Sequence, residues 1–202
     1  MHDSQLIRRE QYVEMPWRNG GGTTFEIARS PATGSEFDWR LSLARIDRSG
    51  PFSNFARYHR AIALVSGAGC VLHGIEADDV VLDAPGRFAI FPGAARVSSD
   101  LLAGSCEDFN LMVREPGSIV HVKHLRAIDP DGESLSAAHY NAVFCLGGSL
   151  MCVDGSDERR NELHFQDTFI VAPTDTRSWR VRATDPEAAA LVCTWENPEK
   201  RE

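Results

Sequence analysis

The chain has 202 residues and a formal net charge of −8 at pH 7; 43% of its residues are hydrophobic and 25% are charged. This is the composition of an ordinary globular protein, long enough for one domain or two small ones. The acidic balance argues against a nucleic-acid partner, because such binding depends on Lys and Arg neutralising phosphates. No run approaches the roughly 20 apolar residues of a membrane span, and residues 1–17 lack the apolar centre of a secretory signal. We therefore expect a cytoplasmic protein with no membrane partner.

The first distinctive stretch is MPWRNGGGTT, residues 15–24. The backbone N–H groups of a glycine-rich loop can wrap an anion, and Arg18 adds a planar donor fork that suits a carboxylate. The spacing fits neither a P-loop nor a dinucleotide fingerprint. The alternative is a structural bulge at which a strand crosses a barrel corner, with Arg18 in solvent. The ligand-binding residues predicted here are Trp17, Arg18, Asn19, Gly20 and Gly21.

From residue 23 onward, short apolar runs alternate with turn clusters about every 8 to 12 residues, which is typical of a β-sandwich or β-barrel. The best helix candidate is a short segment at 185–192, and the alternative for the end of this segment is a strand. The segment DWRLSLARI, residues 38–46, alternates an apolar face with a small polar one. Its polar face either meets solvent or lines a barrel interior that holds a ligand. The apolar face consists of Trp39, Leu41 and Leu43, and the polar face of Arg40, Ser42 and Ala44.

Two further strand patterns carry polar side chains. Thr24 and Glu26 share one face of TTFEIA, and Asp108, Asn110 and Met112 share one face of CEDFNLMVRE. Asp108 and Asn110 need hydrogen-bond partners if that face is buried. The alternatives are a turn cap for Asp108, an exposed position for Asn110 and a solvated charge for Glu26. The predicted ligand-binding set outside the glycine loop is Thr24, Glu26, Arg40, Ser42, His59 and Asn110.

The two halves of the chain contain a weak internal repeat. The hairpin pattern at 62–74 aligns with that at 142–155, and in each half a strand pattern that ends at a proline follows, at Pro92 and Pro173. Chance matches between β-rich segments are the alternative. We predict a duplication into two barrels, residues 1–120 with the ligand pocket and residues 121–202 with a mainly structural role.

The hairpin and the G-x5-P-G pattern at 86–93 are similar to the two cupin signatures, but the usual metal ligands are missing. The first motif offers His59 without a neighbouring H-x-H, and no histidine follows Pro92 before residue 100. We therefore predict no metal and no cofactor. The five cysteines form no C-x-x-C pair, and their apolar surroundings indicate buried free thiols.

The segments MPWRNGGGTTFEIA, FDWRLSLARID and CEDFNLMVR resemble the HutD/Ves family, most strongly over residues 10–115 and more weakly to about 196. The resemblance implies an all-β, metal-free bicupin built from double-stranded β-helix barrels. It also implies a link to histidine utilisation, because the HutD branch accompanies those genes and its members are thought to bind a pathway metabolite such as N-formylglutamate. The Ves branch is linked to stress and cold, and no established activity comes with it.

Two functions are consistent with these observations. The first is a metabolite-binding regulatory protein of histidine utilisation, whose ligand is a small organic acid, N-formylglutamate or urocanate-like. Arg18 and Arg40 would each take a carboxylate, and Asn19 or Asn110 would recognise the amide. The second is a metal-independent isomerase or epimerase that acts on an acidic or sugar substrate, with His59 or Glu26 as the base. No activated nucleophile is identified, which favours binding. A further possibility is an interaction module in which the barrel is merely structural. Cupin barrels often pair through strand edges, so a homodimer is also predicted.

Overall fold

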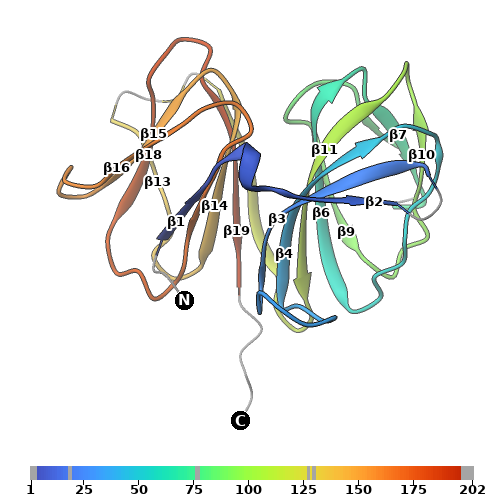
Figure 1. The fold of residues 1–202 in the computed structure, drawn as a ribbon, viewed down its shortest axis with the longest axis horizontal. Helices are drawn as coiled ribbons and strands as arrows, with labels where there is room; N and C mark the ends of the chain where they lie inside the picture. The colour runs from blue at the N-terminus through green and yellow to red at the C-terminus, as the bar shows by residue number, and fades with distance from the viewer. Residues whose placement is uncertain (1–3, 18–19, 76–77, 127, 129–130, 197–202) are drawn as a thin grey trace. The chain divides into compact units, whose positions relative to one another are not determined.

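The computed structural model describes residues 4–17, 20–75, 78–126, 128 and 131–196. Figure 1 shows this part of the chain, which consists of β-strands joined by turns and one short 3₁₀ helix, η1 (Arg9–Gln11). The all-β prediction is confirmed. The helix expected at 185–192 is wrong: a turn leads directly into strand β19 (Ala189–Trp195), whose β-branched and aromatic residues fit a buried sheet.

The chain divides into two compact units. We call residues 12–118 the first barrel, and residues 119–196 together with 4–11 the second barrel. The strands of the first barrel form two sheets. One contains, in spatial order, β2 (Val13–Pro16), β3 (Gly22–Ser30), β4 (Trp39–Ile46), β11 (Cys106–Arg114), β6 (Tyr58–Gly67) and β9 (Phe88–Pro92). The other contains β5 (Gly50–Pro51), β10 (Ser98–Leu101), β7 (Cys70–His73) and β8 (Val80–Leu82).

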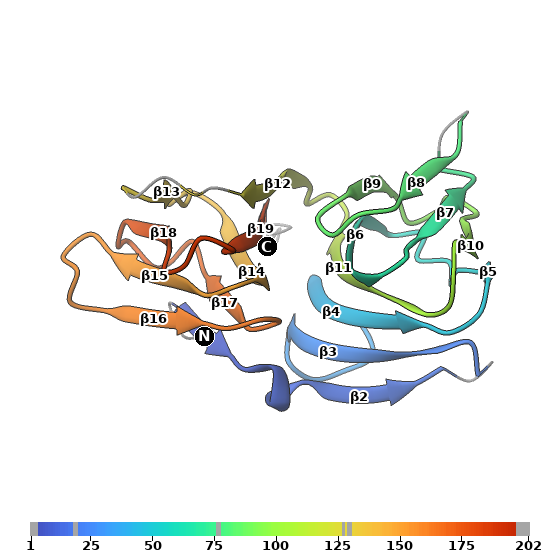
Figure 2. The same ribbon diagram turned by 90° about the horizontal axis from the view of Figure 1, so that it is seen from above.

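The core of the first barrel lies between these two sheets. In Figure 2, β3 and β4 run along one side of the barrel, and β7 and β8 lie on the other. Ile46, Ile62 and Leu64 from the larger sheet pack in one apolar cluster with Leu72 and Leu82 from the smaller one. This cluster closes part of the interior and leaves the remainder to polar residues.

The second barrel repeats the arrangement. One of its sheets contains β1 (Ser4–Ile7), β17 (Thr168–Val171), β14 (Tyr140–Gly147), β19 and β12 (Ile119–Arg126). The other contains β13 (Glu133–Ser134), β18 (Trp179–Ala183), β15 (Leu150–Asp154) and β16 (Arg160–Leu163). Its interior is apolar and is filled by large side chains, including Phe169 and Trp179, whose ring centres are 4.7 Å apart.

The strand order supports a duplication. The order β4-β11-β6-β9 in the first barrel corresponds to β12-β19-β14-β17 in the second, and β5-β10-β7-β8 corresponds to β13-β18-β15-β16. The repeated hairpin patterns found in the sequence fall on β6–β7 and β14–β15. Two halves with the same connectivity are expected when one gene segment has been copied.

The division between barrels at residue 120 needs a correction for the first residues of the chain. Strand β1 pairs antiparallel with β17, with Leu6 opposite Phe169. Just beyond it, Arg8 Nη1 donates to Asp167 Oδ2 at 2.7 Å. Backbone pairing therefore places residues 4–11 in the second barrel, whereas the sequence division had placed them in the first.

The glycine-rich stretch forms the turn of the β2–β3 hairpin. Trp17 N donates to Gly22 O at 2.9 Å, and Gly20 N donates to Trp17 O at 3.0 Å. Gly20 has a φ of 66°, a conformation that glycine adopts without steric cost. Gly21 O accepts from the backbone of Asp47 and Arg48. These contacts give the glycines a structural role as the turn that carries Trp17.

Gly22 marks a close approach of two strands. A Cβ atom at this position would lie 2.2 Å from Arg45 O and 3.1 Å from the Trp17 ring. We expect Gly22→Ala to lower the free energy of unfolding by about 2 kcal/mol, because the β3–β4 pair and the indole must both shift. Gly147→Ala is the matched control, since its Cβ would meet nothing nearer than 3.4 Å. Urea unfolding of the two variants measures the difference, and equal stabilities would contradict the prediction.

Candidate functional site

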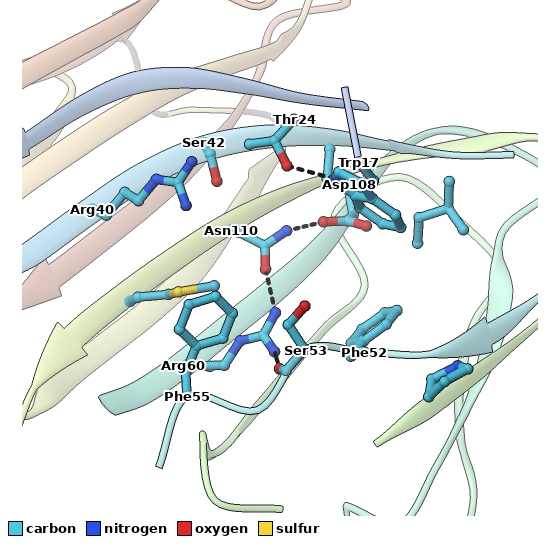
Figure 3. Close-up of a pocket in the computed structure, with 14 residues that line it drawn as sticks. Trp17, Thr24, Arg40, Ser42, Phe52, Ser53, Phe55, Arg60, Asp108 and Asn110 are labelled. Carbon is cyan, nitrogen blue, oxygen red and sulfur yellow. Dashed lines mark hydrogen bonds between the residues drawn. The ribbon is translucent and has the colours of Figure 1, made fainter. Parts of the chain in front are cut away.

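The first barrel encloses a pocket of about 430 Å³. Its polar lining comes mainly from four adjacent strands of the larger sheet, and its apolar lining comes from Trp17, from the end of β5 and the loop after it, and from β4 and β11 (Figure 3). The polar residues are Thr24, Arg40, Ser42, Arg60, Asp108 and Asn110, with Ser53 at the loop. The apolar residues include Trp17, Phe52, Phe55 and Met112.

Strand register explains why these polar residues meet. Asn110 on β11 lies opposite Ser42 on β4, and Met112 lies opposite both Arg40 on β4 and Arg60 on β6. Alternate residues of neighbouring strands share one face, so this face of β11 is flanked by an arginine on each side. In Figure 3, Arg40 and Arg60 lie on opposite sides of Asn110.

Arg60 is the most deeply buried cation of the pocket, with 6% of its surface exposed. Its Cζ atom lies 5.5 Å from the ring centre of Phe52, 5.4 Å from that of Phe55 and 5.2 Å from that of Phe91. Burial lowers the pKa of Arg60 to about 10, so the group stays charged at neutral pH. The aromatic rings hold the guanidinium in place and contribute cation–π attraction.

The hydrogen bonds of Arg60 are incomplete. Nη2 donates to Asn110 Oδ1 at 3.0 Å, and Nη1 makes a long contact with Ser53 O at 3.5 Å. Nε is buried and has no hydrogen-bond partner among the described residues. A buried guanidinium with unused donors is rare in a folded protein, because each unsatisfied donor costs free energy. An anion in the pocket would satisfy these donors.

Asp108 is the second buried charged group, with 2% of its surface exposed. Asn110 Nδ2 donates to Asp108 Oδ1, so one amide bridges the carboxylate and Arg60. Burial raises the pKa of Asp108 to about 7, while Arg60 and the Asn110 hydrogen bond oppose this shift. The carboxyl group is therefore only partly ionised at neutral pH.

The other side of the pocket is held by paired groups. Arg40 Nε donates to Glu26 Oε2 at 2.7 Å, and both side chains are largely buried. Trp17 Nε1 donates to Thr24 Oγ1 at 2.8 Å, which fixes the indole as a wall. Glu26 is thus the counterion of Arg40, and this ion pair fixes the Arg40 side chain at the pocket wall.

The structure brings together only some of the predicted ligand-binding residues. Trp17, Thr24, Arg40, Ser42 and Asn110 line the pocket. Gly20 and Gly21 form the hairpin turn beside it, and Glu26 contributes through Arg40. Arg18 and Asn19 lie outside the described residues.

His59 does not line the pocket, although the sequence analysis included it as a ligand-binding residue and candidate base. Its Nε2 lies 3.6 Å from Glu115 Oε1, and both side chains are well exposed. In strand β6 it precedes Arg60 and so faces the other side of the sheet. We expect His59→Ala to leave the affinity for any pocket ligand within about twofold, as isothermal titration calorimetry measures; a tenfold loss would contradict this placement.

The sequence analysis missed Arg60. The charge at the start of an apolar strand, YHRAIALVSG, carried no motif. A signal was nevertheless present, because Arg60 is in phase with Ile62 and Leu64, which both belong to the core. Asp108 was noted in the sequence but was not included in the predicted site, and Ser53 was not predicted.

The prediction for the cysteines is confirmed. All five cysteines are buried and free, as expected. Within the described residues, no three or more His, Cys, Asp or Glu side chains gather into a group suited to a metal ion. No helix in the described part of the chain has the length and apolar composition that a membrane crossing requires.

Comparison with known proteins extends these observations. A protein of the hutC 3′ region of Pseudomonas putida is 43% identical over 120 residues, which are 55% of this chain and 59% of that protein. Protein Ves of Citrobacter koseri is 37% identical over 99 residues, covering 48% of this chain and 51% of its own length. The matched regions therefore span little more than half the length of these relatives.

Solved structures match over nearly the whole chain. The structure of HutD from Pseudomonas fluorescens SBW25 superposes with a TM-score of 0.80 at 30% identity, covering 97% of this chain and all of that one. An oxalate decarboxylase from Bacillus subtilis, at 8% identity and a TM-score of 0.66, covers 96% of this chain and 77% of that one. The second likeness shows the fold alone.

The paired barrels and their strand order define a double-barrelled, cupin-type protein with its polar pocket in the first barrel. The HutD family model matches residues 9–191 of this sequence. The chain belongs to the HutD family, and the resemblance noted in the sequence is confirmed.

Proposed function

We propose that this protein binds a small organic acid such as N-formylglutamate, without a metal, and that it acts as a regulatory protein of histidine utilisation. The observation that carries the proposal is Arg60, a charged and buried guanidinium that faces the pocket with unused donors. Family membership and the hutC-region relative support the link to histidine utilisation.

The pocket has groups for each end of such a ligand. Arg60 would take one carboxylate, and the Nη groups of Arg40 would take a second one from the opposite side of Asn110. Ser42 and Thr24 offer hydroxyls on the same side of Asn110 as Arg40, and Trp17 with Phe55 would cover the carbon stem. Charge-assisted hydrogen bonds contribute about 1.5–3 kcal/mol each, so two of them with burial of the stem reach micromolar affinity, about −8 kcal/mol.

Calorimetric titration with N-formylglutamate, urocanate and glutamate tests the proposal. We expect at least one of the first two to bind with a dissociation constant of about 10 µM or lower. Phosphate and sodium chloride at matched ionic strength are the controls for unspecific anion binding. If folded protein binds none of the three acids at millimolar concentration, the proposal is wrong.

A second candidate function is a metal-independent isomerase or epimerase, and Asp108 is the observation that favours it. A buried carboxyl group with a pKa of about 7 at a pocket wall has the properties of a general base. Glu26 is held by Arg40, and His59 does not line the pocket. Exchange of the ligand's Cα proton for solvent deuterium, followed by NMR and abolished in Asp108→Asn, would support this candidate; no exchange over days would exclude it for the ligand tested.

The remaining predictions from the sequence stay predictions. They concern the homodimer, the cytoplasmic location and the mainly structural role of the second barrel. The large apolar side chains that fill the interior of the second barrel support the last of them.

A further inference from the structure

The hydrogen bonds of Asn110 give the pocket a fixed polarity. Its Oδ1 accepts from Arg60 and its Nδ2 donates to Asp108, so the orientation of the amide is set from both sides. At one end of this hydrogen-bonded series, Arg60 presents N–H donors to the pocket. At the other end, Asp108 presents a carboxyl oxygen. A ligand that fills the pocket therefore meets two different chemical requirements.

Asp108 has unused capacity as an acceptor. A carboxylate offers about four acceptor sites. Among the described residues, Asn110 provides the one hydrogen bond that Asp108 receives. The neighbouring donor Trp17 Nε1 is already directed at Thr24 Oγ1. Buried carboxyl groups are normally satisfied by several donors, so the missing partner is expected to come from what occupies the pocket.

We propose that Asp108 makes the pocket selective for organic acids that also carry an N–H group, with Arg60 taking the carboxylate and Asp108 accepting from the N–H. The inference rests on the proposed acid-binding function and narrows its ligand class. An acid without an N–H leaves Asp108 unsatisfied, and an oxygen analogue turns a lone pair towards the carboxylate in place of the donor. Sites built to accept a hydrogen bond reject analogues that lack the donor, because a buried polar group then stays unpaired.

The electrostatics of Asp108 agree with this geometry. Burial raises its pKa towards neutrality because too few donors compensate the lost water. A ligand N–H would stabilise the ionised form and lower that pKa again. The Asp108 carboxylate would thus strengthen the binding of an acid that has an N–H group and weaken the binding of an acid that lacks one. Such a site selects its ligand by repulsion as well as by attraction.

Pairs of ligands that differ only in the N–H group test the proposal. Urocanate is compared with 3-(furan-2-yl)acrylate, and N-formylglutamate with 2-(formyloxy)glutarate, in which an ester oxygen replaces the amide N–H. We expect the wild-type protein to prefer the N–H member of at least one pair by 10-fold or more at pH 7.5, as about 1.4 kcal/mol of hydrogen bonding gives tenfold. Calorimetry measures all four affinities.

The variant Asp108→Asn assigns the preference to this residue. Asparagine keeps the size and has no charge, so we expect the preference to fall to about threefold or less while the oxygen analogue binds more tightly. Glu107→Gln is the matched control: it removes the neighbouring charge on the same strand, and Glu107 accepts from Ser66 Oγ and does not line the pocket. The Glu107→Gln variant should prefer the N–H member of each pair as strongly as the wild type does.

The outcomes separate this inference from the function on which it rests. If no acid binds, the proposed function fails. If acids bind but the wild type does not distinguish the members of either pair, or Asp108→Asn keeps the full preference, only the role of Asp108 is wrong. Circular dichroism checks the fold of each variant, and Asp108→Ser, which removes the carboxylate with a smaller side chain, replaces any Asp108→Asn protein that does not fold.

Discussion

Replacing Arg60 by alanine should weaken the binding of N-formylglutamate or urocanate by about 100-fold. The guanidinium is the most deeply buried cation that lines the pocket, and an entering carboxylate would meet its Nη groups, each of which carries two N–H donors. Two charge-assisted hydrogen bonds in a site with little water contribute about 3 kcal/mol or more, which corresponds to about 100-fold. Isothermal titration calorimetry at pH 7.5 measures the loss.

Two further variants show whether charge, geometry or folding causes the effect. Arg60→Lys keeps a positive charge but loses the planar fork, so we expect an intermediate loss of about 10-fold. Arg45→Ala removes an arginine on β4 that pairs with Asp47 outside the pocket, and its affinity should stay within twofold of the wild type. Equal binding by Arg60→Ala and wild type would overturn the assignment of the carboxylate site. If Arg60→Ala is unfolded, Arg60→Lys carries the test.

The sequence predicted the architecture because local pattern and long-range order agree in this chain. Alternation along residues 39–46 gave the two faces of β4, and the structure has Arg40, Ser42, Ala44 and Ile46 lining the pocket. The repeated hairpins predicted two similar barrels, and the strand orders agree. The pairing of β1 with β17 could not be predicted, because it joins residues more than 160 positions apart and no short-range signal marks it.

The candidate site was predicted less completely, for a physical reason. The arginine beside the glycines drew attention because its motif is unusual, whereas Arg60 is a single charge in an ordinary strand. What makes Arg60 a candidate is its environment: the aromatic rings of Phe52 and Phe55 come from a loop whose position depends on the whole barrel. Burial and missing hydrogen bonds are properties of the fold and have no direct sequence signature.

The structure adds one arginine to the two that the sequence predicted. The sequence suggested that Arg18 and Arg40 each hold a carboxylate, and Arg18 lies outside the described residues, so its part stays a prediction. The structure shows Arg40 paired with Glu26 and facing Arg60 across Asn110. The proposed organic-acid ligand therefore rests on Arg40 and Arg60 among the described residues.

The second large expected effect is a dependence of the free energy of unfolding on pH, which Asp108 causes. Between pH 4.5 and pH 7.5 the wild-type protein should lose about 3 kcal/mol more unfolding free energy than Asp108→Asn. The unfolded chain releases the Asp108 proton near pH 4, whereas burial raises the pKa of Asp108 to about 7 in the folded protein. Over this range the folded state holds a proton that the unfolded state has lost, so stability falls as pH rises and levels off above about pH 7.

The comparison with Asp108→Asn isolates this one group. Arg60 faces Asp108 from β6, and its pKa of about 10 keeps it charged throughout the range; Glu107 on β11 also raises the pKa of the carboxyl group and remains in both proteins. The neighbouring thiols of Cys106 on β11 and Cys70 on β7 are likewise present in both proteins. The pKa of the exposed His73 imidazole, which its hydrogen bond to Asp79 raises, is common to both proteins. Urea unfolding at intervals of half a pH unit gives the two curves. Parallel curves would show that Asp108 is already ionised in the folded protein at pH 5, and would then favour a pocket whose Arg60 and Asp108 neutralise each other without a ligand.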